Sequence, residues 1–268
     1  MKKFVVEKKS KLSKYALEIL DDLSFTSLMK SLRKKDVKVN GVRVSKDLSL
    51  NVGDVVEIYY SPAERNRYAK VFEDENILVV NKQSGYTSES VYERVLSDYA
   101  GAKFIHRLDR NTSGLMVFAL NSIAEKELLN GFKNRTFEKY YTAKVIGEMN
   151  PKEKVLTAYL LKDSDSATVR IFDKEQKGSV PIKTGYKVIN EKDGVSTLRV
   201  TLYTGKTHQI RAHLAHIGHP IIGDGKYGDF SYNQAHGLKA QELSATHLVL
   251  HFSKVSPLSY LDGKEFKI

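Results

Sequence analysis

Residues 106–120 constrain the fold of this 268-residue chain more than any other stretch. The first half, His-Arg-Leu-Asp-Arg-Asn-Thr-Ser, is polar, whereas the second half, Gly-Leu-Met-Val-Phe-Ala-Leu, is apolar and favours a strand. The pattern predicts a loop of hydrogen-bonding side chains that leads directly into a buried strand. Any chemistry in this stretch would belong to the loop.

Asp109 is the candidate catalytic group of this loop because Arg107 and Arg110 flank it. Their positive charges favour the ionised carboxylate, which could then act as a nucleophile or a base. The alternative is a surface turn closed by a salt bridge, since structural ion pairs also perturb carboxylates. The loop taken alone leaves both interpretations open.

The chain contains no cysteine, which excludes disulfides, a thiolate nucleophile and cysteine-based zinc or iron–sulfur sites. A reducing cytoplasm suits such a composition. The apolar run at the N-terminus is too short for a signal peptide, and no later stretch is long enough to span a bilayer. We therefore expect a soluble cytoplasmic protein with no membrane partner.

The formal net charge of +11 points to a polyanionic partner, because a strongly basic surface attracts nucleic acid most often. The positive charge is densest at the front, where the first 60 residues carry 13 lysines and arginines against 8 acidic residues. The charge therefore favours nucleic acid as the partner, with membranes and acidic proteins as the alternatives.

Two helices are predicted at the start of the chain. The first covers residues 12–23, with one apolar stripe of the kind found on amphipathic helices. Ser24 or Thr26 can cap the second, whose C-terminal end is basic. The stripe of the first helix consists of Leu12, Ala16, Ile19, Leu20 and Leu23.

A hairpin and a break follow these helices. Valines alternate with polar residues over 37–44 around Asn40-Gly41, a pair that accepts the positive φ angles of a type I′ turn. Residues 52–60 predict a further strand. Residues 61–70 are polar, contain a proline and lose the periodicity, which is typical of a linker.

The remainder of the chain alternates few helices with many strands. We expect a strand at 76–81, a helix at 88–99 and a helix capped by Ser122. Strand-like stretches follow at 139–147, 155–161, 167–172, 184–190 and 195–203. Many strands with few helices between them predict an α+β fold with a mixed, mainly antiparallel sheet.

Three separated stretches resemble the motifs of the RluA-type pseudouridine synthases. They are His-Arg-Leu-Asp with Thr-Ser-Gly-Leu at 106–115, Lys-Tyr-Tyr-Thr-Ala-Lys-Val-Ile-Gly at 139–147, and Thr-Gly-Lys-Thr-His-Gln-Ile-Arg-Ala-His-Leu at 204–214. Two positions depart from the family pattern: Lys206 replaces an arginine, and Gln83 replaces a proline in the turn at 82–85. The arginine-to-lysine change keeps the charge but loses a bidentate fork.

The resemblance implies isomerisation of uridine to pseudouridine in structured RNA, without ATP, metal or redox cofactor. It makes Asp109 the catalytic carboxylate, Tyr141 the residue that packs on the flipped uracil, and Arg211 the partner of Asp109. The first 60 residues resemble an alpha-L RNA-binding domain. The residues expected to contact RNA are His106, Arg107, Arg110, Thr112, Lys206 and His208, together with Lys30, Arg33, Lys34, Lys35 and Arg43.

These interpretations predict an α/β alpha-L RNA-binding domain at 1–62, a linker at 63–70 and a pseudouridine synthase catalytic domain at 71–268. The two-domain layout favours large-subunit ribosomal RNA as the substrate, with transfer RNA as the second choice. A non-catalytic RNA-binding or ribosome-assembly factor remains an alternative. A small-substrate hydrolase that uses Asp109 would not explain the basic charge.

Two further patterns could indicate a nucleotide cofactor or a metal site. Gly-Asp-Gly-Lys-Tyr-Gly at 223–228 satisfies the dinucleotide-binding pattern, but too little chain follows for a βαβ unit, so we expect no nucleotide cofactor. His208, His213, His216 and His219 cluster without a metal-binding spacing or a cysteine, so we expect no metal.

Overall fold

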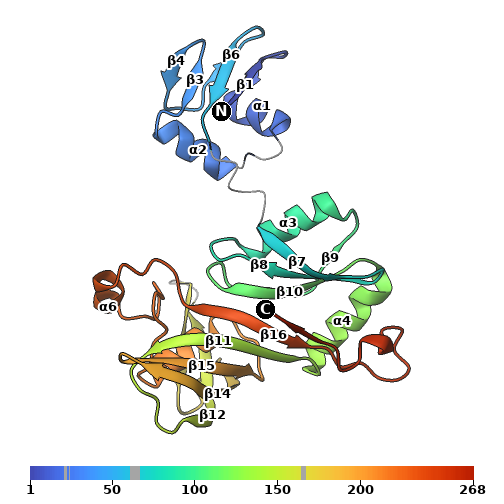
Figure 1. Cartoon of the computed structure of the whole chain (residues 1–268), viewed down its shortest axis with the longest axis vertical. Helices are drawn as coiled ribbons and strands as arrows, with labels where there is room; N and C mark the ends of the chain where they lie inside the picture. The colour runs from blue at the N-terminus through green and yellow to red at the C-terminus, as the bar shows by residue number, and fades with distance from the viewer. Residues whose placement is uncertain (21–22, 24, 61–66, 164–166) are drawn as a thin grey trace. The chain divides into compact units, whose positions relative to one another are not determined.

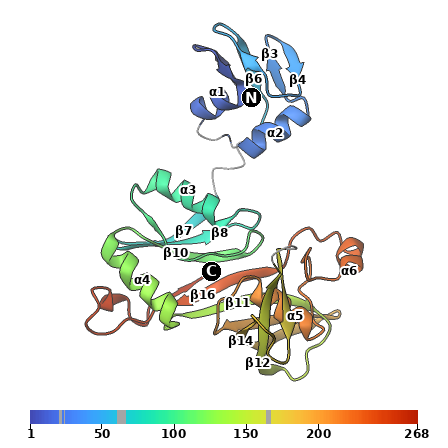
Figure 2. The same cartoon turned by 180° about the vertical axis from the view of Figure 1, so that it is seen from behind.

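The computed structural model describes residues 1–20, 23, 25–60, 67–163 and 167–268 (Figures 1 and 2). The chain divides into two compact units, Met1–Asn66 and Arg67–Ile268, hereafter unit 1 and unit 2. None of the helices within the described ranges is long and apolar enough to cross a membrane.

Unit 1 packs two helices against a four-stranded antiparallel sheet in the order β1-β6-β3-β4. Its core joins buried residues of both helices, among them Leu12, Leu28 and Leu32, to Val37 and Val56 of the sheet. The elements are β1 (Lys2–Val5), β2 (Ser10–Lys11), α1 (Leu12–Ile19), α2 (Phe25–Arg33), β3 (Val37–Val39), β4 (Val42–Val44), β5 (Ser49–Leu50) and β6 (Val55–Ile58).

The predicted hairpin is confirmed. Val39 of β3 pairs with Val42 of β4, which leaves Asn40 and Gly41 as the two turn residues, at φ angles of 51° and 82°. The Asn40 side chain adds a further link, because its Oδ1 accepts a hydrogen bond from the backbone amide of Val55 at 2.8 Å. The turn chemistry thus ties the hairpin to the neighbouring strand.

The predicted first helix was too long. It ends at Ile19, which is 40% exposed rather than turned inward, while Leu20 and Leu23 are buried outside the helix. The apolar spacing continues past the last turn because these two leucines still reach the core from a non-helical segment. Residues 21–22 and the predicted cap Ser24 lie outside the described residues, and Thr26 lies inside α2.

Unit 2 is built on one eleven-stranded sheet, and the predicted α+β class is confirmed. The order is β13-β12-β14-β15-β11-β16-β10-β8-β7, with β17 beside β16 and β9 beside β10. Strands β10 and β16 run parallel, and the other strand pairs of the described sheet are antiparallel. The strands are β7 (Tyr68–Glu73), β8 (Ile77–Lys82), β9 (Lys103–Phe104), β10 (Ser113–Ala119), β11 (Glu138–Ile146), β12 (Glu153–Asp163), β13 (Thr168–Phe172), β14 (Val180–Lys192), β15 (Val195–Leu202), β16 (Leu243–Val249) and β17 (Glu265–Lys267).

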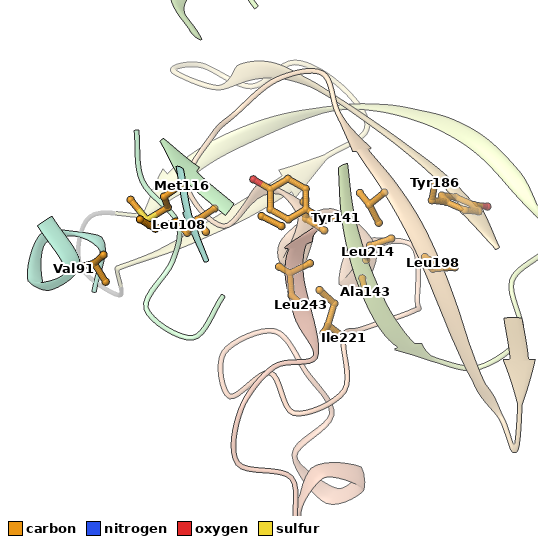
Figure 3. Packing of buried hydrophobic residues seen from close by; sticks show 14 of the residues in the cluster. Val91, Leu108, Met116, Tyr141, Ala143, Tyr186, Leu198, Leu214, Ile221 and Leu243 are labelled. Carbon is orange, nitrogen blue, oxygen red and sulfur yellow. The ribbon is translucent and has the colours of Figure 1, made fainter. Parts of the chain in front are cut away.

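Helices cover both faces of the sheet around β8 and β10, which explains why these strands are almost continuously apolar. On one face Val91 and Val95 of α3 share a buried cluster with Tyr141, and on the other Ala124 and Leu128 of α4 pack with Val117. Figure 3 shows part of the first cluster. The helices are α3 (Ser88–Asp98), α4 (Ser122–Asn134), α5 (Gln209–His216) and α6 (Phe230–Ala235), with a 3₁₀ turn at Ser259–Leu261.

Two predicted boundaries in unit 2 were wrong. The linker was placed at 63–70, but β7 already begins at Tyr68, and residues 63–66 lie outside the described residues. As an edge strand β7 pairs on one side only, and most of its residues are exposed, so its start does not stand out from the polar segment before it. Asn121 rather than Ser122 caps α4, because its side-chain oxygen accepts from the amide of Ala124 at 2.9 Å.

Candidate active site

Asp109 lies in the loop between β9 and β10, in a tight turn. Its backbone carbonyl accepts a hydrogen bond from the amide of Thr112 at 3.0 Å. Its side chain is 23% exposed, so the carboxylate is mostly enclosed but still reachable from solvent. The loop therefore presents one carboxylate from a fixed backbone.

A lysine that the sequence analysis missed holds this loop in place. Lys82, at the end of β8, is fully buried, and its Nζ donates to the carbonyls of Gln83, Tyr86 and Arg110 at 3.0, 2.8 and 3.0 Å. Three acceptors match the three donors of one ammonium group. Burial lowers the pKa of Lys82 to about 8, and the negative charge of Asp109 opposes that shift.

The segment after Lys82 adds further links to the loop. Ser84 Oγ donates to the carbonyl of Asn111 at 2.9 Å, and the amide of Gly85 donates to the carbonyl of Arg110 at 3.0 Å. The Ser88 hydroxyl both donates to the carbonyl and accepts from the amide of Leu108, each at 2.9 Å. The backbone on either side of Asp109 is thus fixed by side chains, despite Gln83 at the position where the family pattern has proline.

Arg211 forms the predicted ion pair with Asp109 across 102 positions of sequence. Its Nη1 donates to Asp109 Oδ2 at 2.9 Å. Two more of its N–H groups donate to Asp224, with Nε to Oδ2 at 2.7 Å and Nη2 to Oδ1 at 2.8 Å. This bidentate contact fixes the plane of the guanidinium, so that Nη1 points at Asp109.

Asp224 is itself fully enclosed, with a side chain that is 0% exposed. Its burial acts to raise the pKa of the carboxyl, but the hydrogen bonds and charge of Arg211 outweigh burial and lower it. The amides of Lys226 and Tyr227 also donate to Asp224, at 2.8 and 3.1 Å. The glycine-rich segment that mimics a nucleotide-binding loop therefore serves to clamp Arg211.

The two arginines beside Asp109 in sequence have other partners. Arg107 Nη1 lies 3.1 Å from Glu89 Oε1, and Arg110 Nε donates to the carbonyl of Gly85 at 2.9 Å. Neither of these two arginines therefore forms the direct ion pair with Asp109. Arg211, brought in by α5, supplies the positive charge instead.

Tyr141 reaches the same site from β11. It is 8% exposed and belongs to the cluster of Figure 3, where its hydroxyl points away from Ala143 and Ile221. Burial raises the pKa of its phenol, and the negative charge of Asp109 adds to the rise. The hydroxyl therefore keeps its proton at neutral pH.

His208, just before α5, also faces the carboxylate. Its Nε2 is 3.9 Å from Asp109 Oδ2, and its Nδ1 is 2.9 Å from the hydroxyl of Tyr227. Burial lowers the pKa of His208, while the charge of Asp109 acts in the opposite direction. The imidazole faces the carboxylate at a distance longer than a hydrogen bond.

These side chains surround a pocket of about 160 Å³. Its lining combines charged and polar side chains, among them Asp109, Arg211 and His208, with apolar ones. Converging polar groups beside apolar walls are the usual form of a small-molecule or base-binding site. The apolar walls are Leu108, Tyr141, Leu202, Ile210 and Leu243.

Two residues predicted to contact RNA have structural roles instead. The His106 ring stacks on Phe132 at 4.4 Å, its Nε2 accepts from the amide of Val117 at 3.0 Å, and burial lowers its pKa to about 3. Thr112 is 2% exposed, and its hydroxyl accepts from Gln241 Nε2 at 2.7 Å. Polar residues in a loop are predicted as exposed, whereas these two hold the loop to the sheet.

The other predicted RNA contacts remain open to solvent. Arg107, Arg110 and Lys206 are exposed, and Lys206 lies at the mouth of the pocket. In unit 1 the five predicted cations are exposed as well, namely Lys30, Arg33, Lys34, Lys35 and Arg43. Within the described part of the chain, no group of three or more histidine and acidic side chains could hold a metal ion.

Comparison with known proteins gives a consistent result. The family model described as RNA pseudouridylate synthase matches residues 76–216. Ribosomal large subunit pseudouridine synthase C of Vibrio vulnificus is 32% identical over 258 residues, which cover 85% of this chain and 81% of that protein. Dual-specificity RNA pseudouridine synthase RluA of Salmonella typhimurium is 35% identical over 202 residues, covering 70% of this chain and 91% of that protein.

Solved structures agree with the sequence matches. Human RNA Pseudouridylate Synthase Domain Containing 1 has a TM-score of 0.61 and 28% sequence identity, and the match covers 68% of this chain and 77% of that chain.

Proposed function

This chain belongs to the RNA pseudouridylate synthase family, and on that premise we propose that it converts specific uridines of large-subunit ribosomal RNA into pseudouridine, with Asp109 as the catalytic carboxylate. The observation that carries the assignment of Asp109 is its place in a small pocket with both polar and apolar walls, paired with a buried arginine whose orientation Asp224 fixes.

The reaction is an isomerisation. The bond between N1 and C1′ breaks, the uracil turns, C5 bonds to C1′, and the proton lost from C5 is balanced by a proton gained at N1. Asp109 can attack C1′ of the ribose, attack C6 of the base, or take part in forming a glycal. The Arg211 contact holds the carboxylate directed towards the pocket.

The target uridine must leave its stack to reach this pocket, which costs a few kcal/mol and is cheapest in loops or distorted helices. Tyr141 offers an aromatic wall on which the flipped uracil can stack. Lys206 and Arg107, both exposed near the pocket, are suited to bind the adjacent phosphates.

The choice of ribosomal RNA is supported by the extent of the matches. The alignment with the large-subunit pseudouridine synthase C covers 85% of this chain and therefore reaches into unit 1. The alignment with the dual-specificity synthase covers 70% and need not include unit 1. We infer that unit 1 is an alpha-L RNA-binding domain. Its exposed cations would add affinity for RNA that weakens with salt.

The test is to map pseudouridine in total RNA from cells with and without the gene, by carbodiimide treatment, primer arrest and mass spectrometry. Loss of specific sites in large-subunit RNA, restored by the wild-type gene but not by Asp109→Asn, would support the proposal. If pseudouridine is lost from transfer RNA alone, transfer RNA is the substrate instead. If every pseudouridine site is retained while the protein still binds RNA, the protein is a non-catalytic RNA-binding factor instead.

Tyr141→Phe should bind RNA nearly as well as the wild type but turn over about a hundred times more slowly. The ring that stacks on uracil remains, whereas the protonated hydroxyl, which could assist proton transfer at C5, is lost. Single-turnover kinetics with saturating enzyme separate the two effects. Tyr141→Leu provides the comparison, because it should weaken binding as well. Equal turnover by Tyr141→Phe and wild type would remove the hydroxyl from the mechanism.

Activity should decline about ten-fold as the pH rises through about 8. In that range Lys82 loses its proton, and a neutral amine can donate to only two of the three carbonyls that position the Asp109 loop. The measurement is kcat/KM between pH 6.5 and 9.5 for wild type and Lys82→Met. The variant should be slower at neutral pH and should lack this decline. A decline caused by ionisation of the uracil would instead be seen in both proteins. If the variant shows the same decline, deprotonation of Lys82 is not its cause.

A further inference from the structure

A second cavity, of about 530 Å³, lies on the other face of the sheet from the active-site pocket. The chain just after β15 forms the wall between them. Leu202 lines the active-site pocket, while the next residue, Tyr203, lines the second cavity, as the alternation of side chains along a strand requires. Further lining residues come from β14, which pairs with β15, and from β12, which pairs with β14 (Figure 1).

Tyr203 offers an open aromatic surface in this cavity. It is 41% exposed. Its ring lies over Gly185, where a Cβ would come within 3.2 Å of ring atom Cε2. Glycine at that point lets the ring rest on the sheet, and Lys183 Nζ lies 4.8 Å from the ring centre.

The cavity is also positively charged. Arg135, at the C-terminal end of α4, and Lys183 both line it, and neither forms an ion pair within 4.0 Å of another described residue. Nearby, burial lowers the pKa of Lys139, and the charge of Arg135 lowers it further. Asp173 is the acidic group of the lining, and its carboxylate lies 2.9 Å from His216 Nε2.

The wall between the two cavities is braced by a buried hydrogen-bond network. Thr204 Oγ1 lies 2.9 Å from Gln209 Oε1, and Gln209 Nε2 donates to the carbonyl of Lys183 at 3.1 Å. Gln209 is 2% exposed and is the first residue of α5, the helix that carries Arg211. A ligand in the second cavity would therefore bind against a rigid part of the active site.

We propose that this second cavity binds an unpaired nucleotide of the RNA substrate, with its base stacked on Tyr203 and its phosphate paired with Arg135 and Lys183. The inference rests on the proposed function for its RNA substrate. Stacking on an aromatic ring beside cations is the common mode of binding single-stranded RNA. The strand that inserts its uridine on one face would pass the end of β15 and place a neighbouring nucleotide on the other.

The test uses the full chain and large-subunit ribosomal RNA transcribed in vitro, measured by filter binding over a range of salt. Tyr203→Ala should raise Kd about five- to a hundred-fold, while Tyr203→Phe should stay within about two-fold of wild type. Lys183→Gln and Arg135→Gln should each lower the slope of log Kd against log salt by about 0.7. Lys126→Gln is the matched control. It removes an exposed positive charge from α4, the helix whose C-terminal end carries Arg135.

A second measurement locates the contact directly. Transcripts containing 4-thiouridine are irradiated with the protein, and the cross-linked peptides are identified by mass spectrometry. We expect a cross-link at Lys183 or Tyr203, neither of which lines the active-site pocket. A Kd of Tyr203→Ala within two-fold of wild type, or cross-links that avoid both residues, would overturn the proposal. If the wild-type protein forms no pseudouridine in this RNA, the substrate assignment fails. The cross-link still shows, independently, whether the second cavity binds RNA.

Discussion

The Asp109→Asn protein should form pseudouridine at least about a thousand times more slowly than the wild type, because an amide can neither attack carbon nor remove a proton. Its fold should be unchanged. The asparagine oxygen can still accept from Arg211 Nη1, and the turn closed by the Thr112 amide depends only on the backbone of residue 109. Tritium release from RNA labelled at C5 of uridine gives the rate directly.

Asp193→Asn is the matched control for this experiment. Asp193 is exposed, and its φ angle of 53° lies in the left-handed region, which asparagine adopts readily. The control makes the same chemical change outside the pocket and should keep full activity. Asp109→Asn activity within ten-fold of the wild type, with RNA binding intact, would assign the chemistry to another group.

Much of the fold follows from local patterns. The apolar run at 114–120 became β10, buried on both faces, and Asn40-Gly41 became the expected two-residue turn. The errors fall where local and tertiary signals differ. Strand β7 is mostly exposed because it lies at an edge, and Leu20 and Leu23 are buried without being helical.

The site is harder to predict because its members are distant in sequence. The pairing of Asp109 with Arg211 came from a family resemblance, since no local spacing relates residues 102 positions apart. Local charge pointed instead to Arg107 and Arg110, which have other partners. Lys82 was missed because a lysine is almost never fully buried, and only the three carbonyls around it make that position stable.

Arg211→Met should lose about 3–5 kcal/mol of stability to unfolding as well as activity, because it leaves the enclosed Asp224 carboxylate without its partner. Asp224→Asn made in the same protein should restore much of that stability. The asparagine is neutral, and its oxygen can still accept from the amides of Lys226 and Tyr227. Activity should not return, because the charge that holds Asp109 is still absent.

Urea unfolding at several pH values gives this prediction a sign as well as a size. In the wild type the pKa of Asp224 is lowered by Arg211, so its contribution to stability is present above the unfolded pKa of about 3.9 and is lost as the pH falls below it. In Arg211→Met burial dominates and raises that pKa above 3.9. The folded variant then binds more protons than the unfolded chain, and its stability should rise as the pH is lowered from 7 towards 4.

The double variant should lose this rise, because it has no carboxyl at position 224 to protonate. If Arg211→Met instead becomes less stable on acidification, as the wild type does, Asp224 is not the uncompensated charge. If the double variant is no more stable than the single one, the cost comes from the volume left by the arginine. Only the charge explanation predicts that one neutral substitution restores stability and abolishes the pH dependence while activity stays lost.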